Sequence, residues 1–257
     1  MIASRSVYDS PRLARQYAFD RPPVHPHIIR AIGAHLRLAA PVGRALDIGC
    51  GAGLSTAALA PLARTLVGLE PVRTMLTHRR AVAPEARFVG GQAERLPFPA
   101  ATFGLLTAAG SLNYADLALF LPEAARVLAP RGVLVIYDFS AGRRLRGSAR
   151  LEEWFAAFER RYPAPPDYDL DVRSLAYGPS GLRLEAYEEM AVAVPMTFGS
   201  YLPYAFSETN VEAAIARGVP EGDIRDWCHD TLARVFAGEP REVLFDAYIA
   251  YVERMRE

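Results

Sequence analysis

Two carboxylates and a run of alternating glycines are the residues of this chain best suited to hold a ligand. Asp47 ends an apolar stretch and precedes Gly49, Gly51 and Gly53, and Glu70 ends the next apolar stretch. Glycine adopts the backbone angles of a tight strand-to-helix turn and has no side chain to keep a ligand away. An acidic residue at the end of a second strand is where a ribose diol is usually bound. The pattern predicts a site for an adenosine-containing cofactor.

The first carboxylate narrows the choice of cofactor. Asp47 precedes a Gly-x-Gly-x-Gly loop, where it would repel the pyrophosphate of a dinucleotide and attract an ammonium group. We therefore expect a partly cationic cofactor whose ammonium group is bound by Asp47, directly or through water. The alternative is that Asp47 caps the turn that follows it.

Four segments of the chain resemble the class I S-adenosylmethionine-dependent methyltransferases, in the small-molecule group that includes the ubiquinone and trans-aconitate methyltransferases. They are residues 45–53 (ALDIGCGAG), 67–71 (VGLEP), 91–98 (GQAERLPF) and 123–136 (EAARVLAPRGVLVI), and they lie within the region 41–140. The resemblance implies S-adenosyl-L-methionine as the methyl donor and S-adenosyl-L-homocysteine as the product. It also implies in-line attack on the sulfonium methyl by an oxygen, nitrogen or carbon atom of a small molecule.

The same resemblance assigns residues to the donor. The glycines of the loop let the methionine part lie against the backbone, Cys50 is a small filler rather than a nucleophile, and Pro71 packs on the adenine. Tyr17 belongs to an N-terminal arm that folds over the donor in relatives. The complete set is Asp47, Gly49, Cys50, Gly51, Gly53, Glu70, Pro71, Gln92, Ala93, Ala109, Gly110 and Tyr17.

The chain departs from the family pattern at two positions. Gln92 stands where relatives usually have an acid that accepts a hydrogen bond from the adenine amino group. Its side-chain carbonyl can make the same bond, and Ala93 would donate its backbone N–H to an adenine ring nitrogen. Gly104 replaces an acid that is common in relatives, which predicts a locally altered turn.

Aromatic and polar residues further along the chain are candidates for binding the acceptor. Asn113 and Tyr114 follow the fourth predicted strand, and each would either orient a substrate or cap the helix beginning near Asp116. Tyr201 and Tyr204 lie in a tyrosine-rich stretch that would line a pocket for an apolar or aromatic metabolite.

No catalytic residue is assigned from the sequence. The available bases are His25, His27, His78, His229, Tyr8, Tyr17 and Asp138, and none stands in a diagnostic pattern. Proximity alone can drive methyl transfer to an atom that is already nucleophilic.

Composition excludes several classes of protein. The 257 residues include 29 basic and 29 acidic side chains, so the balance gives no reason to expect nucleic acid as a partner. Two cysteines, Cys50 and Cys228, are too few for a disulfide framework or a zinc site, which favours a cytoplasmic protein without a metal. No apolar run reaches the length of a membrane span, so no membrane insertion is expected. The oligomeric state leaves no mark on the sequence.

Alternating strand and helix patterns must position these residues. Strands are predicted over 44–48, 66–70, 87–89, 103–108, 133–138, 182–194 and 243–251, and helices over 27–38, 54–62, 72–82, 117–128, 143–161, 210–217 and 223–236. The pattern of 243–251 would also suit a helix. This order predicts an α/β, Rossmann-like, doubly wound sheet of seven strands, mostly parallel with an antiparallel edge strand, plus a cap insertion.

Four regions follow from this order. Residues 1–40 would form an arm and helix over the cofactor, and 41–140 the cofactor-binding core. A late strand and the helical cap would occupy 141–240, and the last core strand 241–257.

The sequence is compatible with three functions from different classes. The favoured one is a methyltransferase acting on a small metabolite. A nicotinamide-dependent oxidoreductase fits the fold by analogy only, and the loop spacing and the segment 91–98 argue against it. A non-catalytic relative that binds the donor is the third, because Gln92 and Gly104 depart from the family pattern.

Overall fold

Short apolar stretches form a sheet that is buried on both faces where its strands are parallel. The computed structural model describes residues 8–165 and 170–255. Its eight-stranded sheet has the order β3-β2-β1-β4-β5-β8-β6, with β7 paired to the other side of β8. The strands are β1 (Val42–Ile48), β2 (Ala63–Glu70), β3 (Arg87–Gly90), β4 (Phe103–Ala109), β5 (Leu128–Phe139), β6 (Arg144–Leu145), β7 (Leu182–Met196) and β8 (Arg241–Arg254).

The direction of the strands confirms the predicted doubly wound topology. Strands β1 to β5 are all parallel, whereas β8 runs antiparallel to both β5 and β7. The chain winds from β1 outward through β2 to β3 and then returns to the other side of β1 with β4. A parallel sheet opens a crevice at the carboxyl ends of the strands where the winding reverses, here between β1 and β4.

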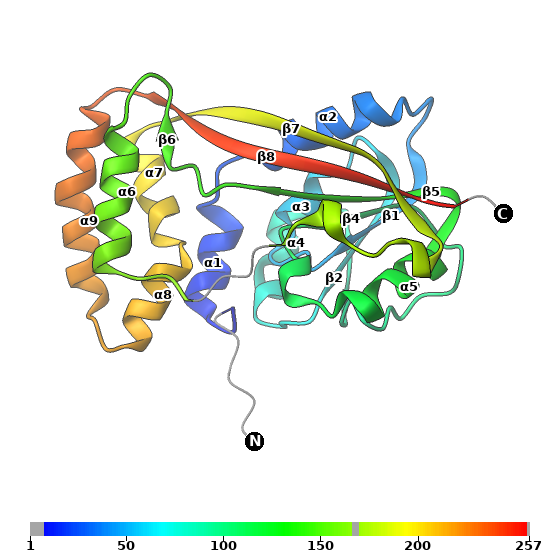
Figure 1. Cartoon of the computed structure of the whole chain (residues 1–257). Helices are drawn as coiled ribbons and strands as arrows, with labels where there is room; N and C mark the ends of the chain where they lie inside the picture. Colours follow the sequence, from blue (N-terminus) through cyan, green and yellow to red (C-terminus); the bar gives the residue numbers. More distant parts are fainter. Residues whose placement is uncertain (1–7, 166–169, 256–257) are drawn as a thin grey trace.

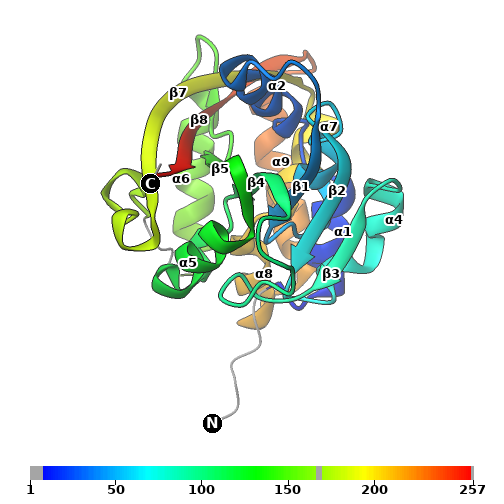
Figure 2. The same ribbon diagram turned by 90° about the vertical axis from the view of Figure 1, so that its right-hand side faces the viewer.

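Helices cover both faces of the parallel strands. Alternate residues of β1 point to opposite faces, so Ala45 packs in one buried cluster with α2 (His25–Leu36), and Leu46 in the other with α5 (Leu117–Val127). Figure 2 shows α2 over one face and α5 along the other. Two shorter helices, α3 (Leu54–Ala58) and α4 (Arg79–Val82), connect the first three strands, together with the 3₁₀ turn η1 (Met75–His78).

Four helices form a cap beyond the carboxyl end of β5. They are α6 (Arg150–Arg161), α7 (Phe198–Phe206), α8 (Thr209–Ala216) and α9 (Glu221–Phe236), and they stand at one end of the long β7–β8 ladder (Figure 1). Aromatic side chains fill the interior of this cap, including Trp154, Phe155, Phe158, Phe206 and Phe236. The helix α1 (Pro11–Phe19) lies between the cap and η1, where Phe19 contacts His78 and Arg12 bonds Glu212.

The structure corrects the predicted elements at three places. The N-terminal arm contains α1, whose first turn is capped by the Ser10 hydroxyl and begins with Pro11, a start signal that was missed. The predicted helix over 143–161 is wrong for its first turns, because Gly147 adopts a positive φ of 74° and the chain forms β6. The predicted helix over 72–82 is divided between η1 and α4.

Candidate functional site

The carboxyl ends of four parallel strands and the N-terminal helices enclose a pocket of about 450 Å³. Each of β1, β2, β4 and β5 contributes its last residues or the loop after them. We call this cavity the donor pocket. It is lined by Tyr8, Tyr17, Arg21, Pro22, His25, Gly49, Cys50, Gly51, Ala52, Leu54, Ser55, Glu70, Pro71, Val72, Met75, Ala109, Gly110, Ser111, Tyr114, Asp138 and Phe139.

The loop after β1 requires glycine for two separate reasons. Gly49, Gly51 and Gly53 have φ angles of 64°, 54° and 99°, in the left-handed region that other residues adopt at a cost. A Cβ on Gly49 would lie 2.5 Å from the Cβ of Ser111, so the β4 loop packs directly on the backbone there. A Cβ on Gly51 would meet only the Met75 methyl group, at 3.5 Å. The glycines therefore bring two loops together and keep the pocket floor open.

Asp47 lies beneath the loop rather than in the pocket. Its side chain is fully buried and accepts hydrogen bonds from the hydroxyls of Ser55 at 2.6 Å, Thr56 at 2.7 Å and Thr107 at 2.9 Å. Burial raises the pKa of Asp47, and the three hydroxyl groups oppose that rise. The structure does not bring Asp47 to the pocket wall, and the neighbouring Ser55 lines the pocket instead. The carboxylate organises the start of α3.

Glu70 reaches the pocket from the end of β2. Its side chain is 6% exposed and accepts backbone N–H bonds at 2.9 Å from Gly51 on one oxygen and from Val72 on the other. Burial raises the pKa of Glu70, and the two N–H groups oppose that rise. A carboxylate oxygen can accept two hydrogen bonds, so each oxygen keeps capacity for a ligand hydroxyl. Glu70 thus joins the glycine loop to the β2 loop and presents an acceptor pair to the pocket.

The opposite end of the pocket, near β5, carries a buried cation. The Arg21 guanidinium carbon lies 3.9 Å from the centre of the Tyr17 ring. Its terminal nitrogens bond Glu208 at 3.3 Å and the Ser207 carbonyl at 2.9 Å, so Arg21 connects the N-terminal region to the cap. The Nε of Arg21 is buried without a partner in the described part of the chain. Among the buried side-chain polar atoms of the pocket-lining residues within residues 8–165 and 170–255, this donor is the one without a partner.

His25 stands at the same end, at the first turn of α2. Its Nδ1 lies 2.9 Å from the Tyr137 hydroxyl, and its ring meets the Phe139 ring edge-on at a centroid distance of 5.1 Å. Burial, helped by the positive charge of Arg21, lowers the pKa of His25 to about 4. His25 is therefore neutral at physiological pH.

Nine of the sequence-predicted residues line the pocket together. They are Tyr17, Gly49, Cys50, Gly51, Glu70, Pro71, Ala109, Gly110 and Tyr114. The Cys50 thiol is buried, which raises its pKa well above the ordinary value and suits a filler. Asp47, Gly53, Gln92, Ala93 and Asn113 lie outside the wall of this cavity. Gly53 caps α3, and Gln92 is exposed beyond the end of β3.

The expectation that Tyr201 and Tyr204 face a substrate is wrong. Both side chains are buried in the cap core, at 0% and 1% exposure. Their hydroxyls donate to the carbonyls of Gly142 at 2.8 Å and Ala141 at 2.7 Å. These tyrosines hold the chain after β5 against α7, and they leave no group for a ligand.

The sequence assigned no site role to Arg21, His25 or Phe139, although His25 was named among the possible bases and Arg21 lies in the arm expected to fold over the donor. Arg21 and His25 precede the recognisable motifs, and Phe139 follows them, so no local pattern marks them. The cluster forms because α2 packs on the sheet face that Tyr137 occupies. Only the fold brings these positions together.

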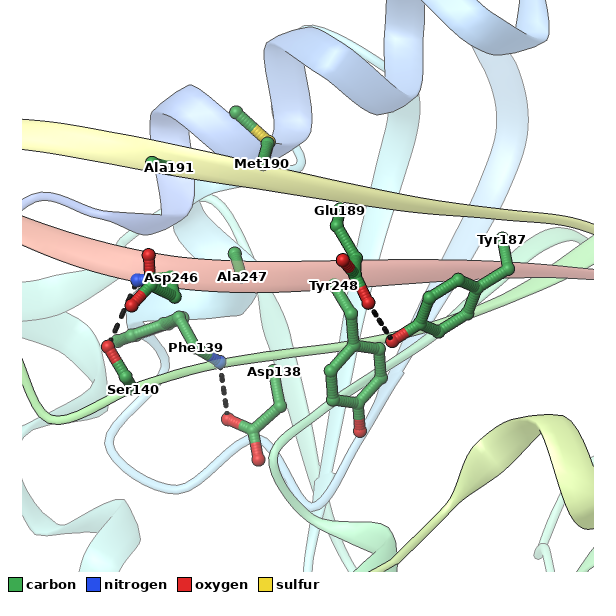
Figure 3. A pocket seen from close by; sticks show the side chains of 10 residues that line it. All are labelled: Asp138, Phe139, Ser140, Tyr187, Glu189, Met190, Ala191, Asp246, Ala247 and Tyr248. Atoms are coloured by element: carbon green, nitrogen blue, oxygen red, sulfur yellow. Dashed lines mark hydrogen bonds between the residues drawn. The ribbon is translucent and has the colours of Figure 1, made fainter.

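A second, more open cavity of about 700 Å³ shares Asp138 and Phe139 with the donor pocket. Figure 3 shows the Tyr187 and Tyr248 rings side by side beneath β7 and β8, stacked at a centroid distance of 5.8 Å. The Asp138 carboxylate points to the same side and accepts from the Phe139 N–H at 2.8 Å. The two cavities are therefore neighbours across the end of β5.

Neither a metal-binding cluster nor a membrane-spanning helix occurs in residues 8–165 and 170–255. No cluster of three or more histidine, cysteine or acidic side chains there is arranged to hold a metal ion. No helix in those ranges combines the length and the apolar character that crossing a membrane requires.

Comparison with known proteins places the pocket in a family context. Residues 46–136 match a family model described as a methyltransferase domain. The phthiotriol/phenolphthiotriol dimycocerosates methyltransferase of Mycobacterium leprae is 35% identical over 120 residues, which are 45% of this chain and 42% of that protein. The demethylmenaquinone methyltransferase of Beutenbergia cavernae is 35% identical over 103 residues, or 40% and 43%. The alignments thus span less than half of these relatives.

Solved structures share the fold over nearly the whole chain. A putative type II methyltransferase from Anaeromyxobacter dehalogenans superposes with a TM-score of 0.66 at 20% identity, covering 92% of this chain and 99% of that one. The family match extends from β1 to β5, and the ends of four of these strands form the donor pocket.

Proposed function

We propose, from the premise that residues 46–136 are a class I S-adenosylmethionine-dependent methyltransferase domain, that this chain methylates a small, apolar or aromatic molecule. S-adenosyl-L-methionine is the donor and S-adenosyl-L-homocysteine the product of such domains. The names of the two relatives, a phthiotriol/phenolphthiotriol dimycocerosates methyltransferase and a demethylmenaquinone methyltransferase, support a small-molecule acceptor.

The observation that carries the proposal is the span of the donor pocket. Its wall runs from Glu70 at the end of β2 to Phe139 at the end of β5, across β1 and β4. Three strand spacings amount to about 14 Å, enough for an elongated nucleoside with an amino acid attached. Glu70 offers its two oxygens to the ribose hydroxyls, which sets the direction in which the ligand lies. The nucleoside end is then at β2 and the reacting end at β5.

The remaining contacts follow from that direction. Pro71 flanks the adenine, with Gln92 and Ala93 at its outer edge, and the backbone of Gly49 and Gly51 lies under the methionine part. The positive charge of Arg21 at this end of the pocket suits the methionine carboxylate. The ammonium group is received at Ser55, whose hydroxyl donates to Asp47 and so keeps its oxygen as an acceptor.

When bound, the sulfonium supplies an electrophilic methyl group. The task of the protein is then to align an acceptor behind that methyl group and to exclude water. Tyr17 and Tyr114 close the pocket from the outside, and Ala109 and Gly110 pass beside the methionine part. The open cavity beside Asp138 and Phe139 offers the acceptor a route to the reacting end.

Calorimetric titration of the purified chain with S-adenosyl-L-homocysteine and, separately, with NAD and NADP tests the choice of cofactor. We expect micromolar binding of the homocysteine compound and no heat from the dinucleotides. Preferential dinucleotide binding would support the oxidoreductase and overturn the proposal.

Turnover of methyl-labelled donor in the presence of metabolite extracts then tests catalysis. We expect label to move into a small molecule that organic solvent extracts. Donor that is bound but never consumed with any extract would favour the non-catalytic relative.

A further inference from the structure

We propose that His25 is a fixed hydrogen-bond donor for the acceptor, and that the acceptor carries an enolate or phenolate oxygen which this donor binds. The inference rests on the proposed function, because it concerns the reacting end of the same pocket. The methyl group goes to that oxygen or to the atom conjugated with it.

The position of His25 makes it available to the acceptor. The residue lines the donor pocket beside Asp138 and Phe139, at the end away from the ribose-binding Glu70. Its Nδ1 is engaged by Tyr137, and its ring is held by the edges of two aromatic rings, Tyr137 and Phe139. Within residues 8–165 and 170–255 the ring makes no hydrogen bond through Nε2, and the partly exposed side chain faces open space. That space is the pocket.

The hydrogen bond with Tyr137 determines which ring nitrogen of His25 carries the hydrogen. Its hydroxyl is fully buried, and His25 Nδ1 is the hydrogen-bond partner that residues 8–165 and 170–255 give it. If Nδ1 carried the hydrogen, the tyrosine hydrogen would be left without an acceptor, at a cost of about 1–3 kcal/mol. Tyr137 therefore donates to Nδ1, and the hydrogen of the imidazole lies on Nε2. Tyr137 is a positioning residue in this scheme.

A neutral imidazole in this state is a donor and not a base. Protonation of His25 would place a second positive charge in a buried site near Arg21, and its pKa of about 4 reflects that cost. The acceptor must then arrive as an anion or ionise readily, losing its proton to solvent before transfer. During transfer the new bond to the methyl carbon forms as the sulfur–methyl bond breaks, and sulfur keeps the electron pair.

Charge at this end of the pocket favours an oxyanion over an amine. Arg21 and the sulfonium of the bound donor are both positive, and an aliphatic amine would add a further positive charge because it is protonated at neutral pH. Glu208 pairs with Arg21, and the Asp138 carboxylate accepts from the Phe139 N–H. The Nε2–H of His25 adds a fixed hydrogen-bond donor that stabilises negative charge on the acceptor oxygen.

Nitrogen-15 spectra of the histidine side chains test the tautomer directly. The chain has five histidines, and a His25→Gln variant identifies the signals of His25. In protein saturated with S-adenosyl-L-homocysteine, we expect a neutral ring protonated on Nε2 throughout pH 6–8. Tyr137→Phe should lose this preference while keeping the affinity for the homocysteine compound. An Nδ1–H tautomer or an imidazolium in that range would overturn the proposal.

A matched pair of probes tests the acceptor class. We expect 4-nitrophenol at pH 8, largely the phenolate, to bind the homocysteine-saturated protein at least tenfold more tightly than 4-nitroaniline. His25→Phe should abolish the difference, and His25→Gln, which retains an N–H donor, should keep part of it. Equal binding, no phenolate binding, or an undiminished preference in His25→Phe would overturn the proposal. Failure of S-adenosyl-L-homocysteine to bind would instead refute the proposed function, and the tautomer would still be measurable in the free protein.

Discussion

At the scale of single residues, Glu70 joins two loops of the protein through the same two oxygens that we propose for ligand binding. It ties Gly51 to Val72 through their backbone N–H groups and faces the donor pocket. Its position at the end of β2 is what the sequence predicted for a ribose acceptor, and the bonds to the two loops are an addition that only the structure reveals.

Replacing Glu70 with alanine should weaken binding of S-adenosyl-L-homocysteine by about 1.5–3 kcal/mol, because one or two charge-assisted hydrogen bonds are lost. Calorimetry measures the change. Glu70→Gln keeps one oxygen acceptor and should lose less, and substitution of the exposed Glu85 provides a control with no expected effect. Wild-type affinity in Glu70→Ala would remove this residue from the site.

His25 should make part of the stability depend on pH. Its pKa is 6.5 in the ordinary state and about 4 in the folded protein, so between these values the unfolded chain binds a proton that the native state does not. The contribution is complete above about pH 6.5 and is lost as the pH falls toward 4, amounting to about 3 kcal/mol at most.

Urea unfolding of the wild type and of His25→Gln between pH 4 and 7.5 measures this contribution as a difference. The wild type should gain stability over the variant as the pH rises. Arg21 and Tyr137 lie beside the ring, and Tyr17 and Asp138 line the same pocket, in both proteins. The raised pKa values of Glu70 and Glu208 act with opposite sign in both proteins, so these effects cancel in the difference. A difference that does not change with pH would mean that His25 titrates normally.

At the scale of elements, one glycine of the loop is required for packing and another keeps the donor pocket open. Gly49 packs against Ser111 from the β4 loop, whereas Gly51 faces the pocket and the end of Met75. Both have positive φ angles. The same backbone strain therefore applies to both positions, and only the neighbours differ.

Gly49→Ala should destabilise the protein more than Gly51→Ala. Each alanine costs about 1–2 kcal/mol for the left-handed backbone, and the contact with Ser111 adds to the cost at position 49. Gly51→Ala should fold but lose at least tenfold in affinity for S-adenosyl-L-homocysteine, because its methyl group enters the pocket. Thermal unfolding and calorimetry on the two variants decide. Equal stabilities with unchanged affinity at position 51 would contradict this division.

The cap tyrosines should matter for stability alone. Tyr201→Phe and Tyr204→Phe each leave a buried carbonyl without its hydroxyl donor, at a cost of about 1–2 kcal/mol. Tyr187→Phe, whose hydroxyl bond to Glu189 is long and exposed, is the matched control and should change little. Urea unfolding measures the cost, with donor-product affinity expected to be unchanged in all three. A loss of affinity without a loss of stability would show that Tyr201 and Tyr204 contribute to ligand binding.

The elements differ in how far their sequence determines them. The glycine loop, Glu70 and the parallel strands were predictable because each depends on residues that are neighbours in the chain. The tyrosine-rich stretch from Met196 to Phe206 was not, since a buried tyrosine and a ligand-facing one have the same local sequence. In the folded cap, the tyrosine hydroxyls of α7 are bound by the carbonyls of Ala141 and Gly142, which only the fold brings close to them.

At the scale of the whole molecule, the N-terminal region joins the cap to the core across the donor pocket. Arg12 bonds Glu212 in α8, Arg21 bonds Glu208, and Asp9 accepts from Thr74 at 2.5 Å just before η1. Tyr8 and Tyr17 from the same region line the pocket. The site is therefore completed by residues that precede the matched segment and by the end of β5, whereas residues 46–136 supply the glycine loop, Glu70 and the β4 loop with Tyr114. This explains why Arg21 and His25 could not be placed from motifs.

A crystal structure with S-adenosyl-L-homocysteine bound would show directly whether the donor lies in the donor pocket and in which direction. We expect the ribose hydroxyls on Glu70, the amino-acid part along Gly49 and Gly51, and the sulfur toward His25 and Phe139. A ligand lying in the opposite direction, a ligand bound elsewhere, or a donor pocket that stays empty at saturating concentration would contradict it.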